Sequence, residues 1–172
     1  MNTLFYIAGA VAVLCTLRVV THTNAVHALL YLIVSLLAAA LIFFLLGAPF
    51  AAALEIIIYA GAIMVLFVFV IMMLNLGTPT DRDQKPCLRP AGWWGPAILA
   101  SVLLVEVVYV LAAGGGFPAV NAPVGPHTLG RALFGPYALG LELASVLLMA
   151  GLVGAYHLAR PRGADRAEGG AP

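Results

Sequence analysis

The sequence contains very little charge. Asp, Glu, Lys and Arg make up 9% of its 172 residues, whereas they make up roughly a quarter of an average soluble domain. Hydrophobic residues account for 63%, and the mean hydropathy is +1.08. A chain of this composition could not cover its apolar surface in water, so these values argue against a soluble domain and predict an integral membrane protein.

Catalytic and cofactor motifs are also missing. The sequence has no nucleotide-binding glycine loop, no catalytic triad and no zinc motif. Its two cysteines, Cys15 and Cys87, lack metal-ligand spacing and form no C-x-x-C pair, so they predict neither a metal site nor a redox site. The first apolar run has no positive region before it and no clean A-x-A pattern after it, so we interpret it as a retained helix and not a signal peptide.

The sequence does contain long hydrophobic runs. Five stretches are long enough to cross a hydrocarbon core about 30 Å thick as helices with a rise of 1.5 Å per residue. They are continuously apolar instead of alternating, which favours helices over a β-barrel. The sequence therefore predicts an all-α bundle of five transmembrane helices in one domain, residues 1–160, followed by a flexible tail, residues 161–172. The predicted helices are 2–20, 26–46, 51–75, 93–113 and 133–158.

The basic residues predict the orientation of this bundle. With five crossings, seven of the eight Lys and Arg residues lie on one side, and Arg131 lies on the other, with the amino terminus. By the positive-inside rule the amino terminus is outside and the carboxyl terminus is cytoplasmic. Residues 77–92 then form a cytoplasmic loop, and the Gly/Pro-rich residues 114–132 form an irregular, packed outer loop. Three arginines near the carboxyl end are topology determinants or contacts for anionic lipids: Arg160, Arg162 and Arg166.

Three glutamates fall inside the predicted helices, where a charged side chain costs roughly 2.5–3.5 kcal/mol on insertion scales and needs a reason. From the helical rise, Glu55 lies about 6 Å and Glu142 about 10 Å from the outer ends of their helices. Glu106, on a helix of opposite direction, also falls in the outer half. Together they are candidates for a polar layer that relays protons. Alternatively, they reach toward the outer interface or are satisfied by a neighbouring helix.

Tyr59 and Gly61 form a second candidate site, in the third predicted helix. Tyr59 follows Glu55 by one helical turn and lies near mid-membrane. Gly61 follows the β-branched run 56–58, whose stiff side chains crowd the turn. A glycine beside a crowded turn lowers the cost of a π-bulge, a feature common at functional sites. Gly61 could instead, or in addition, permit close helix packing.

The sequence closely resembles subunit J of bacterial respiratory complex I, the homologue of the sixth mitochondrially encoded chain. The resemblance extends from the amino terminus to about Arg160, and its most specific part is YAGAIMVLF in the third helix. Three runs carry it: LRVVTHTNAVHALLYLI, ALEIIIYAGAIMVLFVFVIMMLNLG and LFGPYALGLELASVLLMAGLVGA.

The resemblance implies a non-catalytic membrane subunit of proton-translocating NADH:quinone oxidoreductase in the bacterial cytoplasmic membrane. Its partners would be membrane subunits of the A, H, K and N types, membrane lipids and the quinone, with no nucleic acid. No redox cofactor would bind this chain, and FMN and iron–sulfur clusters would lie in partner subunits.

The resemblance also carries expectations for single residues. Tyr59 and Gly61 match the family's π-bulge motif, where a change between bulged and regular helix is linked to a water path. Glu55 and Glu142 lie within matching stretches, and Glu106 belongs to no motif of the family.

Two other functions fit the residues less well. A small proton- or cation-coupled transporter would use Glu55 or Glu142 as its carrier carboxylate, but the sequence lacks an internal repeat and has few polar residues to line a path. A purely structural assembly subunit would differ only in that Tyr59 and Gly61 would not matter to turnover.

Overall fold

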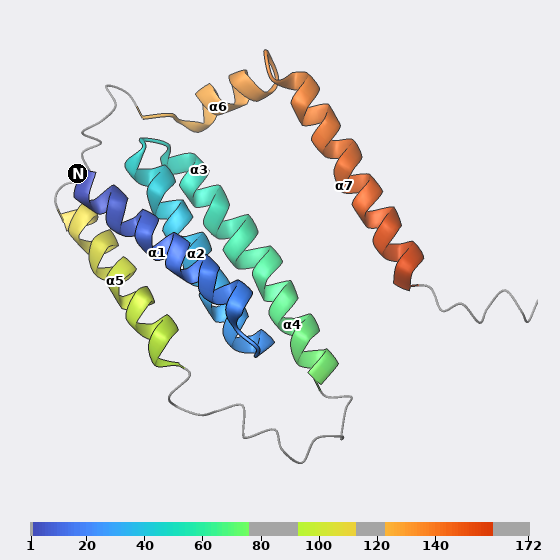
Figure 1. Cartoon of the computed structure of the whole chain (residues 1–172). Helices are drawn as coiled ribbons and strands as arrows, with labels where there is room; N and C mark the ends of the chain where they lie inside the picture. The colour runs from blue at the N-terminus through green and yellow to red at the C-terminus, as the bar shows by residue number, and fades with distance from the viewer. Residues whose placement is uncertain (1, 76–92, 113–122, 160–172) are drawn as a thin grey trace, which may run out of the picture. The chain divides into compact units, whose positions relative to one another are not determined.

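A computed structural model describes residues 2–75, 93–112 and 123–159 of the chain. Within these ranges the secondary structure is helical and contains no strand. Five helices are long and apolar enough to span a membrane, which confirms the predicted all-α, five-span architecture. The chain divides into two compact units, residues 1–125 and 126–172, and each is described separately below (Figure 1).

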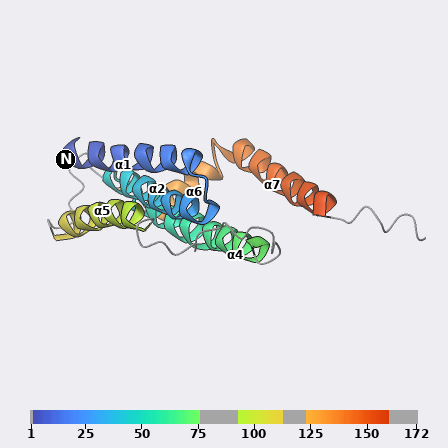
Figure 2. The same ribbon diagram turned by 60° about the horizontal axis from the view of Figure 1, so that its bottom comes forward.

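The first unit holds four of the five spans. They are α1 (Asn2–Thr21), α2 (Ala25–Leu45), a third span made of α3 (Pro49–Leu54), η1 (Glu55–Ile63) and α4 (Met64–Asn75), and α5 (Trp94–Ala112). Helix α2 is central, because it contacts α1, α5 and all three parts of the third span (Figures 1 and 2).

The core of this unit lies where α1, α2 and α5 meet. Its small residues let the helix backbones approach closely, as is usual where transmembrane helices pack. A hydrogen bond also joins α1 to α2, since the hydroxyl oxygens of Thr16 and Ser35 are 2.9 Å apart. Eight buried residues make up the core: Ala8, Val11, Cys15, Tyr31, Val34, Ala38, Leu41 and Leu103.

Polar groups and glycine shape the connections within the first unit. The Asn24 side chain caps α2, because its oxygen accepts hydrogen bonds from the backbone N–H groups of Val26 and His27 at 3.0 and 3.4 Å. Gly47 ends the α2–α3 connection with a positive φ of 82°, which favours glycine. Its carbonyl oxygen also accepts a hydrogen bond of 2.8 Å from the Val124 N–H, so the middle of the predicted outer loop contacts this turn.

The second unit contains α6 (Pro126–Leu133) and α7 (Ala138–Ala159). The prediction that residues 114–132 are irregular was wrong for residues 126–132, which belong to α6. Helix α6 begins with Pro126, and proline suits the first helical position because its missing N–H would have no partner within the helix there. The fifth span also begins at Ala138 and not at 133, since Gly135 and Pro136 interrupt the apolar run with a turn. The predicted tail, residues 161–172, and the predicted loop 77–92 lie outside the described residues.

Candidate functional site

The third span is interrupted by a π-helical segment. Pro49–Leu74 is one apolar stretch long enough to cross a membrane, yet η1, nine residues from Glu55 to Ile63, is a π-helix within it. The N–H of Met64, where the α-helix resumes, is directed at the carbonyl oxygens of Gly61 and of Tyr59, five residues back. π-helices are rare and most are single turns inside α-helices at functional sites, so this segment is the first candidate for function.

Gly61 is the residue whose lack of a side chain suits this geometry. A Cβ atom on Gly61 would lie 3.2 Å from the carbonyl oxygen of Ile56, closer than ordinary van der Waals contact. Ile56 precedes Gly61 by five residues, the spacing of a π-type hydrogen bond. From the sequence, Ile56 was expected only to crowd the turn before Gly61, because its five-residue spacing from Gly61 has meaning only in a π-helix.

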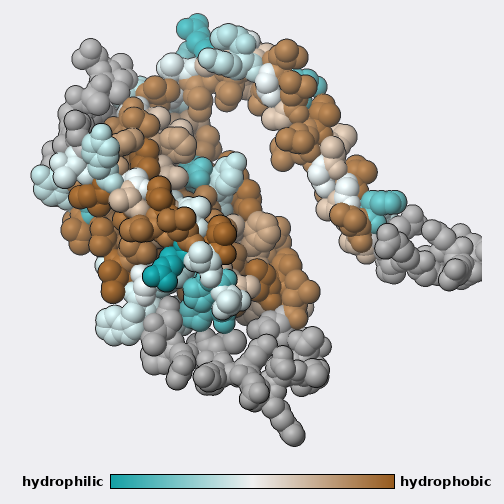
Figure 3. Space-filling model, viewed as in Figure 1, coloured by the Kyte–Doolittle hydropathy of each residue, from teal (hydrophilic) through white to brown (hydrophobic). Residues whose placement is uncertain are grey.

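Tyr59 faces away from the core of the first unit. Its side chain is 51% exposed, and η1 as a whole contains no buried residue although it packs beside α2. Its neighbours Ile56, Ile57 and Ile58 are exposed as well. Figure 3 shows that the visible surface is covered largely by apolar side chains. The Tyr59 phenol therefore has to find its polar partner outside the core of the first unit.

The three predicted carboxylates lie in different surroundings. Glu55 is half-buried and begins η1, six residues after Pro49, so it lies about 9 Å along the helix axis from the start of this span. Glu142 is exposed on α7, four residues after Ala138, so it lies about 6 Å along the helix axis from the start of α7. Glu106 is buried in the first unit. The structure thus groups Glu55 with Tyr59 and Gly61 on η1, and places Glu106 and Glu142 on other helices.

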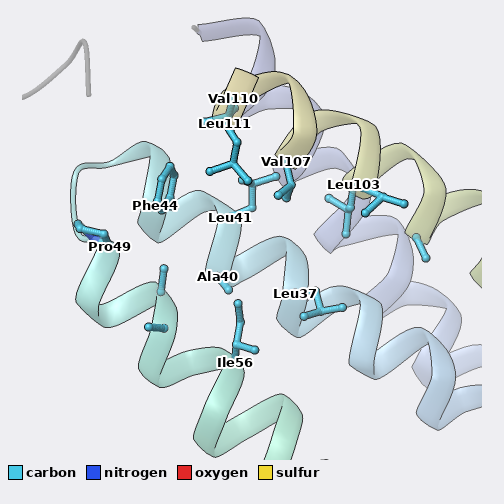
Figure 4. Close-up of a pocket in the computed structure, with 14 residues that line it drawn as sticks. Leu37, Ala40, Leu41, Phe44, Pro49, Ile56, Leu103, Val107, Val110 and Leu111 are labelled. Atoms are coloured by element: carbon cyan, nitrogen blue, oxygen red, sulfur yellow. The ribbon is translucent and has the colours of Figure 1, made fainter. Parts of the chain in front are cut away.

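A pocket opens beside η1, and the side chains that line it are all apolar. It has a volume of about 410 Å³ and lies between α2, the third span and α5, with Ile56 on its wall (Figure 4). Leu41 and Phe44 from α2 and Leu103 and Val107 from α5 are among its other side chains. Because no lining side chain is polar, no side chain of this pocket could bind an ion or carry a proton.

The histidines at the α1–α2 connection differ from each other. His22 accepts a hydrogen bond of 3.1 Å from the Asn24 N–H at its Nδ1 atom, which is a local capping role. His27 is 7% exposed and stacks on His22, with ring centroids 5.4 Å apart. His27 is therefore a buried residue of this connection and not a solvated one.

Metal ligation is not indicated in the described part of the chain, where no group of three or more His, Cys, Asp or Glu residues could hold a metal ion. Cys15 is fully buried in the core, where it acts as a small apolar residue, and Cys87 lies outside the described residues. That redox cofactors bind only in partner subunits therefore stays a prediction.

Five apolar spans, one of them broken by a π-helix, define a multi-pass helical membrane protein. A model of the family described as NADH-ubiquinone/plastoquinone oxidoreductase chain 6 matches residues 15–158, and the chain belongs to this family.

Individual relatives agree with the family match. NADH-quinone oxidoreductase subunit J of Escherichia coli (strain K12) is 56% identical over 160 residues, which cover 93% of this chain and 87% of that protein. The subunit J of Pseudomonas aeruginosa is 59% identical over 165 residues, covering 93% of this chain and 97% of that protein. That of Rhodobacter capsulatus is 38% identical over 160 residues, covering 88% and 77%. The predicted resemblance to subunit J is confirmed.

Proposed function

We propose that this chain is the J-type membrane subunit of a proton-pumping NADH:quinone oxidoreductase, and that it couples quinone reduction to proton translocation through a change in its third span. The observation that carries the proposal is the π-helix from Glu55 to Ile63 at the position of the family's bulge motif. The family membership and the identity to subunit J proteins support the same assignment.

The proposed coupling uses backbone hydrogen bonds. Where a helix passes between α and π hydrogen bonding, at least one carbonyl loses its usual partner, and in hydrocarbon that carbonyl requires water or another polar group. A return of η1 to α-helix would remove this requirement. The segment can therefore admit water in one form and exclude it in the other, and the exposed Tyr59 hydroxyl can hold that water next to a neighbouring subunit.

In this proposal Glu55 and Glu142 act through their charge or as nearby proton acceptors. Neither is the carrier carboxylate of a transporter, which would be exposed to the two sides of the membrane in turn. Glu55 begins η1, so its carboxylate is placed to respond when the segment changes form. Glu142 lies on α7 and is exposed within the second unit, where a partner chain or an interface can reach it. The apolar lining of the pocket beside η1 gives no support to a transporter that works alone.

The proposal also covers the orientation of the chain in the membrane, its partner subunits and the location of the redox cofactors. Its amino terminus is outside and its carboxyl terminus cytoplasmic, in the bacterial cytoplasmic membrane. Its partners are the A-, H-, K- and N-type membrane subunits and membrane lipids. The chain has no catalytic residue of its own, and FMN and iron–sulfur clusters belong to other subunits.

Affinity purification of the tagged chain from its own membranes tests the assignment. The chain should copurify with many subunits, with flavin and iron–sulfur spectra, and with NADH:quinone activity. Purification of the chain alone, together with proton or cation transport by the purified chain in vesicles, would instead support the transporter. Normal pumping in complexes assembled with an η1 that is held in one form would support a purely structural subunit.

A further inference from the structure

Glu106 lies on the face of α5 that packs into the core of the first unit. Leu99, Leu103 and Val107 follow each other at four-residue spacing and pack in or against that core. Glu106 is three residues after Leu103, so it lies on the same side of α5. It is 4% exposed, which makes it the most enclosed carboxyl group among the described residues.

Neither oxygen of this carboxyl group has a hydrogen-bond partner among the described residues. By helical rise Glu106 is about 18 Å from Trp94 at one end of α5 and about 9 Å from Ala112 at the other, so it cannot reach either interface easily. Buried polar atoms are paired with protein or water in more than roughly 90% of cases. This carboxyl group therefore requires a ligand that the described helices do not supply.

No Lys, Arg or His belongs to the core that α5 packs against, among the residues that the structure describes. The core facing α5 consists of apolar residues of α1 and α2, and its ionisable members, Cys15 and Tyr31, are both neutral groups in their ordinary state. The hydroxyls of Thr16 and Ser35 are already bonded to each other and to the Ala12 carbonyl. An ionised carboxylate without a partner is costly in such surroundings, so a bound proton is the simplest compensation.

We propose that Glu106 is an internal proton-binding site, a carboxylic acid hydrogen-bonded to water held between α1, α2 and α5. The proton comes from the aqueous phase, so no hydroxide is left in the core, and the acid donates one hydrogen bond to the bound water and accepts another from it. Ala8 and Ala38, fully buried on α1 and α2, are short core side chains on the helices that α5 packs against. A helical carbonyl retains a second lone pair, which such a water can use.

This site differs from η1 in both position and chemistry. It lies on α5, which packs against α1 and α2, and it depends on burial of a side chain instead of on backbone hydrogen bonding. Glu106 would bind its proton whether or not η1 changes form, so its test is independent of the coupling proposed above.

A high-resolution cryo-electron microscopy map of the intact complex in lipid tests the water. We expect density for water within about 2.7–3.2 Å of the Glu106 carboxyl oxygens. A lysine, arginine or histidine of any chain in contact with the carboxyl group would overturn the proposal. A dry carboxyl group with no density beside it would overturn it equally.

The Glu106→Gln complex tests the charge. Gln is neutral and close in shape to the acid, so subunit content and thermal transition should equal those of wild type. If Glu106 were instead an ionised partner of a hidden cation, Gln would leave that cation buried and unpaired, and both quantities should fall clearly. Such a fall would reject the proposal. Glu55→Gln is the matched control, because it makes the same chemical change at a less buried site.

Infrared difference spectra between the wild-type and Glu106→Gln complexes show directly whether the Glu106 carboxyl group is protonated. We expect the variant to lose the carbonyl band of one carboxylic acid, and this band should shift when wild type is transferred to D2O. Loss of a carboxylate band, or an acid band that does not respond to D2O, would contradict the proposal.

Discussion

A Cβ atom on Gly61 would come within 3.2 Å of the carbonyl oxygen of Ile56. The two residues are five apart, so this proximity belongs to the π-helical form of the segment. One added carbon needs the neighbouring backbone to move by a few tenths of an ångström, and a β-branched side chain needs more and also stiffens the turn. The side chain at position 61 therefore influences which helical form the third span adopts.

Gly61→Val should lower coupled turnover several-fold, and Gly61→Ala should lower it less. A bias of 1–2 kcal/mol changes the ratio of two forms by a factor of roughly 5–30, enough to depopulate one of them. In membranes, NADH oxidation by ferricyanide should remain near normal, while NADH:quinone activity and the proton gradient fall well below it.

Gly9 provides the matched control, because a Cβ atom there would meet nothing within 4 Å. Gly9→Val should leave all three activities near wild type. Full quinone reduction and pumping in Gly61→Val would show that Gly61 serves packing only. Subunit content is measured alongside, and the Gly61→Ala complex provides the comparison if Val prevents assembly.

Tyr59→Phe should produce a milder form of the same pattern. The substitution removes only a hydroxyl, and a typical hydrogen bond contributes about 0.5–1.5 kcal/mol. Since the side chain is 51% exposed within this chain, its loss should not destabilise the first unit. Quinone-dependent proton pumping in vesicles should fall by roughly two- to tenfold. Unchanged pumping would mean that the phenol holds no water or partner that matters to coupling.

Glu55→Gln and Glu142→Gln should each leave the complex assembled, with at most a partial loss of pumping. Glutamine keeps the size of the side chain and much of its hydrogen bonding, and neither residue is buried in this chain. The ratio of protons pumped to NADH oxidised is the relevant measurement. Complete loss of pumping in Glu55→Gln, at normal subunit content, would reveal an obligatory relay at that carboxylate.

Gly95→Ala should destabilise the contact between α2 and α5. A Cβ atom on Gly95 would overlap the hydroxyl of Tyr31, a buried residue of the core. Overpacking of this kind costs about 1–3 kcal/mol. The thermal transition of the complex should fall, and the second substitution Tyr31→Phe should restore part of it by removing the overlapping oxygen. No recovery in the double variant would show that another contact limits the space at Gly95.

Cysteine labelling tests the proposed orientation. Thr23, exposed between α1 and α2, should react with an impermeant maleimide from the cytoplasmic side after Thr23→Cys. Thr128, exposed on α6, should react from the outside after Thr128→Cys. A background with Cys87→Ser avoids labelling of that natural cysteine. The opposite result at both positions would reverse the orientation.

The five spans could be predicted from the sequence because hydrocarbon imposes one simple requirement, a continuous apolar run about 20 residues long. Their ends were less certain. Leu133 and Phe134 extend the last apolar run, yet Gly135 and Pro136 separate them from α7. The helix α6 was missed, because its Gly- and Pro-containing composition resembles that of an irregular loop.

The candidate site was predictable only in part. The pair Tyr59 and Gly61 pointed to the third span, but a glycine in a membrane helix also suits close packing, and the nine-residue length of η1 could not be read from it. The burial of Glu106 depends on how α5 turns toward α1 and α2. Hydropathy and helical rise gave its depth but not the helices that surround it.

The central position of α2 has a consequence for the order in which the protein is made. Ribosomes release the amino-terminal part of a chain first, and early segments generally fold first. The hairpin of α1 and α2, with its three-residue connection and its Thr16–Ser35 hydrogen bond, can therefore close before the later spans are synthesised. The third span and α5 then meet a preformed surface of α2. The nine-residue π-helix, which is a weakly stable form of helix by itself, therefore enters the membrane next to an α1–α2 hairpin that has already folded.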